Sequence, residues 1–210
     1  MRRYPLVVAL VILLAACQLA SAPVSAPIAS PTSHTSATAA ALQPADVPAG
    51  LASCPGSGPL ATYLADIKTS NPTLAQKLAA QWAALNKAGS QDAAIVLYAA
   101  DPSSCAAELA ATGNGKSAAS VVVAFHDEGE ADRAWEAGIL GFVPPAPGEV
   151  PPGMARGKAT GLGDSSWTYR NAPVLLACWR KSVFVALVVV TNLDDTSFMA
   201  ATAAVDARLN

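Results

Sequence analysis

Residues 165–190 read SSWTYRNAPVLLACWRKSVFVALVVV and contain three expected strands with very little chain between them. The first two lie near 165–170 and 173–179, and the third, from Val183 to Val190, is the longest. Connections this short require neighbouring strands to pair antiparallel. A further short strand is expected just upstream, near 156–160. The C-terminal part of the chain is therefore predicted to form an antiparallel sheet.

Upstream of these strands, helices and strands are mixed. Short apolar runs predict two more strands, Ala94–Ala99 and Ala119–Phe125, and the second of these is apolar on both faces. Apolar residues spaced three or four apart, with Pro and Gly at the ends, predict helices. These helices are expected near 60–67, 72–88, 101–111 and 127–140, and from Asp195 to the C-terminus. The pattern predicts an α+β fold with a single antiparallel sheet and helices packed on one face, after a disordered N-terminal tether.

The N-terminal segment has the pattern of a signal peptide. Arg2 and Arg3 precede an uninterrupted apolar run from Leu6 to Ala16. These 11 residues would extend only about 16 Å as a helix. A lasting transmembrane helix needs about 20 apolar residues. Residues 1–16 are therefore predicted to be a removable export signal.

The apolar run ends in Leu14-Ala15-Ala16-Cys17, which resembles the lipobox of bacterial lipoproteins. The resemblance implies that Cys17 becomes the N-terminus and carries diacylglycerol on its sulfur. The protein is then expected on the extracytoplasmic face of a cell membrane, inner or outer, anchored by lipid. An ordinary secretory signal with a chance cysteine is the alternative. Arg2-Arg3 also leaves the export route open between the general and twin-arginine pathways.

Residues 17–48 are dominated by Ala, Ser, Pro and Thr and contain almost no charge or aromatic residue. Such a segment buries too little apolar area to offset the entropy of ordering. It is predicted to be a disordered tether. The remainder, residues 49–210, is long enough for one α+β domain with a substantial core.

The charge balance argues against nucleic acid as a partner. Removing Arg2 and Arg3 from the 13 basic residues leaves 11 against 15 acidic ones, a formal net charge of −4. No basic cluster follows the signal segment. Binding to phosphate backbones depends on such clusters. The expected partners are the membrane, through the N-terminal lipid, and an envelope protein or a small apolar ligand.

Cysteine use predicts one disulfide bond. With Cys17 assigned to lipid, Cys54, Cys105 and Cys178 remain, and thiols outside the cytoplasm tend to pair. Cys54 and Cys105 lie at loop or helix-end positions, whereas Cys178 lies within an apolar strand. We therefore favour a Cys54–Cys105 bond with Cys178 as a buried free thiol. Pairing of Cys105 with Cys178 remains the alternative.

Two motifs suggest chemistry, but neither predicts a catalytic or metal site. Gly113–Ser117 resembles the end of a phosphate-binding loop, yet Ala110 stands where that motif needs glycine, and a strand follows instead of a helix. The acidic cluster His126–Asp132 is typical of a helix N-terminus in which Asp127 is the cap. A zinc site needs at least three ligands, and weak calcium binding is the remaining possibility for these acids. No catalytic residue, metal or cofactor is predicted.

The tryptophans suggest one candidate binding surface. Trp82 and Trp135 fall on apolar helical stripes and are expected in the core. Trp167 and Trp179 lie on the late strands, where an exposed aromatic surface is possible. These two residues are the predicted binding surface.

A loose resemblance extends over residues 118–209. Gly161-Leu162-Gly163-Asp164-Ser165, then strands, a Val-rich strand and a closing helix, resemble the C-terminal half of small extracytoplasmic lipoproteins and sensor domains of high-GC bacteria. These include the sensor domain of certain mycobacterial Ser/Thr kinases. The resemblance implies a ligand- or partner-binding domain and not an enzyme.

Three functions follow in order of preference. The first is a membrane-anchored, non-catalytic binding domain of the sensor type. The second is a carrier of an apolar envelope molecule, with the strands at 119–125 and 183–190 beside a cavity. The third is a hydrolase that uses His126. A deep apolar cavity favours the carrier, whereas a filled core with exposed Trp167 and Trp179 favours the binding domain.

Overall fold

The computed structural model describes residues 35–101, 103, 105 and 115–210. The predicted signal segment, Cys17 and most of the tether lie outside the described residues. So does most of the helix expected near 101–111. Among the helices that the structure does describe, none has the length and apolar character needed to span a bilayer.

The described strands form one eight-stranded sheet in which every pair is antiparallel. The strand order is β1-β3-β4-β8-β7-β6-β5, and β2 also pairs with β3. In chain order the strands are β1 (Ala52–Ser53), β2 (Gly58–Pro59), β3 (Ser90–Ala99), β4 (Ser117–Phe125), β5 (Met154–Arg156), β6 (Ser166–Asn171), β7 (Val174–Lys181) and β8 (Phe184–Thr191). The predicted α+β fold with a single antiparallel sheet is confirmed.

The strand expected near 156–160 is shorter and lies earlier. β5 ends at Arg156, and a short 3-10 helix, Gly157–Thr160, follows it. Gly157 has a positive φ of 66°, which glycine adopts without steric cost. The hydroxyl of Thr160 donates to the carbonyl of Gly157 at 2.9 Å and closes the turn. The residues expected to form a strand therefore form a turn, which Gly157 and the Thr160 hydroxyl stabilise.

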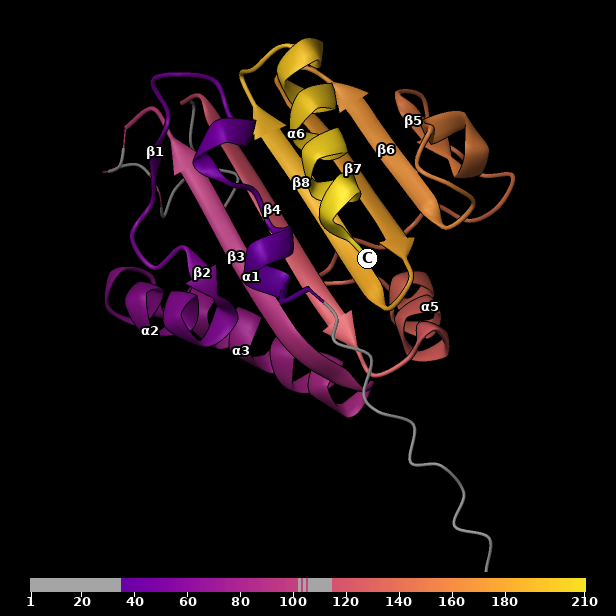
Figure 1. The fold of residues 1–210 in the computed structure, drawn as a ribbon, viewed down its shortest axis with the longest axis horizontal. Coiled ribbons are helices and arrows are strands. Elements are labelled where there is room, and N and C mark those ends of the chain that lie inside the picture. The colour runs from indigo at the N-terminus through magenta and orange to yellow at the C-terminus, as the bar shows by residue number, and fades with distance from the viewer. Residues whose placement is uncertain (1–34, 102, 104, 106–114) are drawn as a thin grey trace, which may run out of the picture. The chain divides into compact units, whose positions relative to one another are not determined.

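The helices cover both faces of the sheet, whereas the sequence predicted one covered face. They are α1 (Ala37–Ala40), α2 (Leu60–Ser70), α3 (Pro72–Lys87), α5 (Glu128–Ala137) and α6 (Asp195–Arg208). In Figure 1, α1 and α6 lie across the face that is turned toward the viewer. One core cluster packs under α1 and α6, and a second packs against α2, α3 and α5. The central strands are apolar on both sides, so both faces need a cover.

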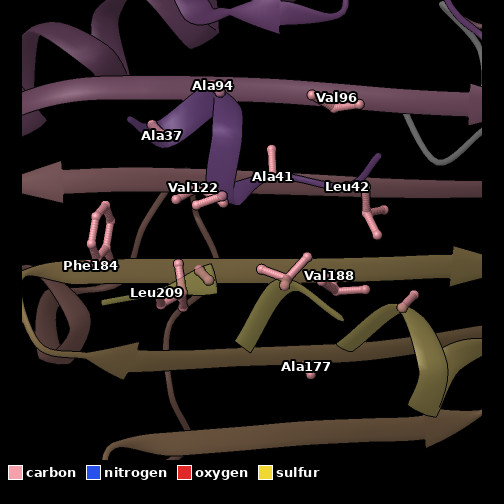
Figure 2. Packing of buried hydrophobic residues seen from close by; sticks show 14 of the residues in the cluster. Ala37, Ala41, Leu42, Ala94, Val96, Val122, Ala177, Phe184, Val188 and Leu209 are labelled. Atoms are coloured by element: carbon pink, nitrogen blue, oxygen red, sulfur yellow. The ribbon is translucent and has the colours of Figure 1, made fainter. Parts of the chain in front are cut away.

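The folded domain begins by Thr35, so the prediction that residues 17–48 are all disordered is wrong for their C-terminal part. Ala37, Ala40, Ala41 and Leu42 are fully buried. The backbone amide of Leu42 donates to Ser120 Oγ on β4 at 3.0 Å. Figure 2 shows Ala41 and Leu42 beside side chains of the central strands. The small alanine side chains allow this backbone to lie close to the sheet. The overall composition of residues 17–48 does not reveal this packing.

Arg208 at the end of α6 fastens this N-terminal segment. Its guanidinium donates to the carbonyl of Ala41 at 3.1 Å and forms an ion pair with Asp46, which is 10% exposed. Asp46 belongs to the 3-10 helix Pro44–Asp46. Partial burial of both groups makes this pair stronger than an exposed one. The two ends of the described chain are thus held together on one face of the sheet.

Side-chain caps explain where three helices begin. Asn71 Oδ1 accepts from the amide of Leu74 at 3.1 Å at the start of α3. Asp127 and Asp194 cap α5 and α6 in the same way, each at 2.8 Å. Such caps satisfy amides that have no partner within the helix. The predicted role of Asp127 as a helix cap is confirmed, and α3 begins at Pro72, where a helix was expected.

Candidate functional site

The predicted aromatic surface at Trp167 and Trp179 is wrong. Trp179 is 0% exposed and Trp167 is 4% exposed. Trp179 points toward α6, where its Nε1 donates to Asp206 Oδ1 at 3.0 Å. Trp167 lies in the cluster on the opposite face. An exposed surface was expected, but helices cover both faces of the sheet. The strands that carry Trp167 and Trp179 therefore have no exposed face at these positions.

The predicted disulfide bond is confirmed. Cys54 and Cys105 are bonded, and among the described cysteines Cys178 is free and buried. Cys178 faces the cluster that also contains Trp167 and Leu187. Burial raises the pKa of the Cys178 thiol to about 12. A thiol is nucleophilic only when it is deprotonated, so Cys178 is chemically inert in the folded protein.

We therefore expect iodoacetamide at pH 8 to leave Cys178 unmodified in the native protein. Unfolding in guanidinium chloride should allow complete modification, because the thiol then regains its ordinary acidity and access to solvent. Peptide mass spectrometry without reductant measures both states. Modification of native Cys178 at the unfolded rate would contradict its burial.

His126, Asp127 and Glu130 gather at the N-terminus of α5. One potential ligand atom from each lies within 4.8 Å of the others. Asp127 Oδ1 is already used as the helix cap, and His126 and Asp127 are exposed. The carboxylate of Glu130 reaches toward Gly89, at the turn that precedes β3. Capping accounts for Asp127, whereas Glu130 Oε2 is buried and has no hydrogen-bond partner among the described atoms.

A cavity of about 530 Å³ lies between one face of the sheet and α3. Pockets that hold small molecules commonly have volumes of about 300–1,000 Å³. β3, β4, β7 and β8 form its floor, α3 forms one wall, and Leu140 and Phe142 after α5 form another. The apolar lining residues are Leu74, Leu78, Ile95, Leu97, Ala119, Val121, Leu140, Phe142, Val174, Leu176, Leu187 and Val189.

The alternation of side chains along β4 and β8 explains why the floor of the cavity is apolar. Side chains two residues apart on a strand point to the same face, so Ala119 and Val121 lie together, as do Leu187 and Val189. Val121 and Leu187 are buried, whereas Ala119 and Val189 are only partly buried. The floor therefore runs from the core to a region that solvent reaches. The strands expected to flank a cavity, 119–125 and 183–190, do so at this end.

Polar groups lie on the α3 side of the cavity. Asn71, Thr73, Lys77 and Gln81 line it from this helix. Lys77 is exposed, and the described residues include no hydrogen-bond or ion-pair partner for it. Gln81 Oε1 is buried and has no partner among the described atoms. A buried oxygen without a donor is costly, so water or a ligand is expected to bind it.

Reasoning from the sequence found the floor of the cavity but not its α3 wall. The apolar stripe of the helix expected near 72–88 contains Leu74 and Leu78, and both line the cavity. Lys77 and Gln81 gave no signal, because an isolated Lys or Gln on a helix is typical of a solvated face. Their position one turn apart beside that stripe was the available clue.

No family model, no curated protein and no solved structure matches this chain.

Proposed function

We propose that this protein is a non-catalytic binding domain that holds an apolar small molecule in the cavity between the sheet and α3. The observation that carries the proposal is the cavity itself, about 530 Å³ in volume and lined mainly by aliphatic side chains. Removing an apolar ligand from water against such a lining is favourable, by roughly 25 cal/mol per Å² of apolar surface.

The lining supports binding more than chemistry. Among the described lining residues the polar side chains are amides, hydroxyls and one lysine, with no histidine, cysteine or carboxylate. General acid–base catalysis usually uses a pair of titratable groups within hydrogen-bond reach of a substrate. His126 lies beyond β4 at the start of α5 and does not line the cavity. A hydrolase is therefore the weaker proposal.

The resemblance of Leu14-Ala15-Ala16-Cys17 to a lipobox supports a lipid anchor at Cys17, on the extracytoplasmic side of a membrane. Because the domain begins by Thr35, the tether is shorter than residues 17–48 suggested. Only residues 18–34 then separate Cys17 from the described domain. We propose that the cavity works close to the bilayer surface, where apolar molecules are available. A sensor domain and a carrier would both begin by binding such a molecule in the cavity.

The substitution Ala119→Trp tests the cavity, because it places an indole on the floor at a partly buried position. We expect the wild-type chain to bind the uncharged fluorophore N-phenyl-1-naphthylamine with saturable enhancement of its emission. The variant should bind it at least about tenfold more weakly, because the indole occupies the ligand's space. Fluorescence titration measures both affinities.

Ala83→Trp is the matched control, since Ala83 is exposed on α3 and does not line the cavity. It should bind the fluorophore like the wild type. Val189→Trp fills the same space from β8 and guards against misfolding of the first variant, which circular dichroism checks. Equal binding by all four proteins would refute the assignment of the cavity as the binding site.

A further inference from the structure

We infer that the ligand is an amphiphile with one apolar chain and an anionic headgroup, and that Lys77 holds the headgroup at the rim of the cavity. The inference rests on the proposed function, because it names the class of molecule that the same cavity takes. Three features of the α3 wall carry it.

The first feature is the charge of the rim. Among the described lining residues, Lys77 is the one charged side chain, and no acidic residue accompanies it. In the described part of the chain its ammonium group has no ion-pair partner, whereas Arg156, Arg170, Arg180, Lys181 and Arg208 each have one. A cation beside an apolar cavity and away from carboxylates favours an anion as its partner.

The second feature is the direction of α3. Its N-terminal turn, with Asn71, Thr73 and Leu74, lies at the cavity. A helix carries a partial positive charge at this end, and no acidic residue in the first turn offsets it. The helix end and Lys77, about one turn further on, therefore add to the same positive potential. Neither would attract a cationic headgroup.

The third feature is the contrast between rim and floor. Lys77 and Thr73 are exposed, whereas Leu78, Leu187 and Leu176 behind them are buried. An amphiphile matches this gradient, because its chain can cover the leucines while its headgroup stays in contact with water. A molecule charged along its whole length would lose hydration on the aliphatic floor.

Three probes with the same chain and different headgroups test the inference: dodecanoate, dodecanol and dodecylammonium. Each is titrated below its aggregation limit against the full chain by displacement of N-phenyl-1-naphthylamine. We expect dodecanoate to bind on the order of tenfold more tightly than dodecanol, and dodecylammonium to bind more weakly than either. Raising the ionic strength should reduce the advantage of dodecanoate, because salt screens charges at an exposed rim.

Lys77→Met removes the charge and keeps a similar apolar stem. It should abolish the advantage of dodecanoate and leave the affinity for dodecanol unchanged. Lys87→Met is the matched control, since Lys87 is exposed at the other end of α3 and does not line the cavity. It should keep the wild-type preference.

The outcomes separate this inference from the function on which it rests. If dodecanol binds as tightly as dodecanoate, or if Lys77→Met keeps the preference, the anionic class is wrong while the apolar cavity stands. If none of the three probes displaces the fluorophore, and the fluorophore itself does not bind, the proposed function fails as well.

Discussion

Leu42→Ala is expected to lower the free energy of unfolding by about 2–5 kcal/mol, the usual range for removing a fully buried leucine side chain. Leu42 is 1% exposed and belongs to the buried cluster that also contains Val96, Val122 and Val188. A residue of a disordered tether would show almost no such loss, and the composition of residues 17–48 predicts a tether at this position. Urea denaturation followed by tryptophan fluorescence measures the change.

Val143→Ala is the control for this effect, because Val143 is 57% exposed. Its unfolding free energy should stay within about 0.5 kcal/mol of the wild type, as is usual for surface changes. An equally small effect of Leu42→Ala would show that the segment after Thr35 does not belong to the folded domain.

Loss of the Cys54–Cys105 bond is expected to cost about 4 kcal/mol. The two cysteines are 51 residues apart, and the chain-entropy model assigns this value to a loop of that length. The double variant Cys54→Ser with Cys105→Ser avoids an unpaired thiol. Thermal unfolding with and without reductant measures the effect, and reductant should destabilise the wild type but not the double variant.

The same bond also supports the cavity. Cys54 and Cys105 pack with Leu97 and Ala119, which line it. Reduction of the wild type should therefore weaken the binding of N-phenyl-1-naphthylamine as well as stability. Unchanged stability after complete reduction would contradict a structural role for the bond.

Local patterns predicted most of the fold well. The late strands, the antiparallel sheet, α3 and the closing helix follow from apolar spacing and turn residues, which act within a few positions along the chain. The disulfide bond followed from the positions of the cysteines. These features depend on neighbours in sequence, so a single sequence contains their signal.

The errors arose where distant segments meet. Ala37–Leu42 looks like a linker by composition, and its burial depends on a groove formed by β3, β4 and α6. Trp179 looked free because nothing in its strand reveals that Asp206 of α6 lies at its ring nitrogen. A short apolar strand is compatible with one or two covered faces, and only the packed helices decide between them.

The cavity shows the same division. Its floor could be anticipated from the strands that are apolar on both faces, and its position beside Leu187 and Val121 agrees with that expectation. Its rim could not be anticipated, because only the position of α3 relative to the sheet places Lys77 and Gln81 at the cavity. Sequence patterns thus predict the apolar floor, and the tertiary arrangement supplies the polar wall.

The most direct test of ligand binding is native mass spectrometry of the full chain, extracted in mild detergent from the membranes of the cells that make it. We predict a non-covalently bound molecule on the wild type and on Ala83→Trp, released as an organic acid on denaturation, and its loss from Ala119→Trp. A wild-type chain with no bound mass that also fails to take up added dodecanoate, or an Ala119→Trp chain that carries the same molecule in the same amount, would contradict the account.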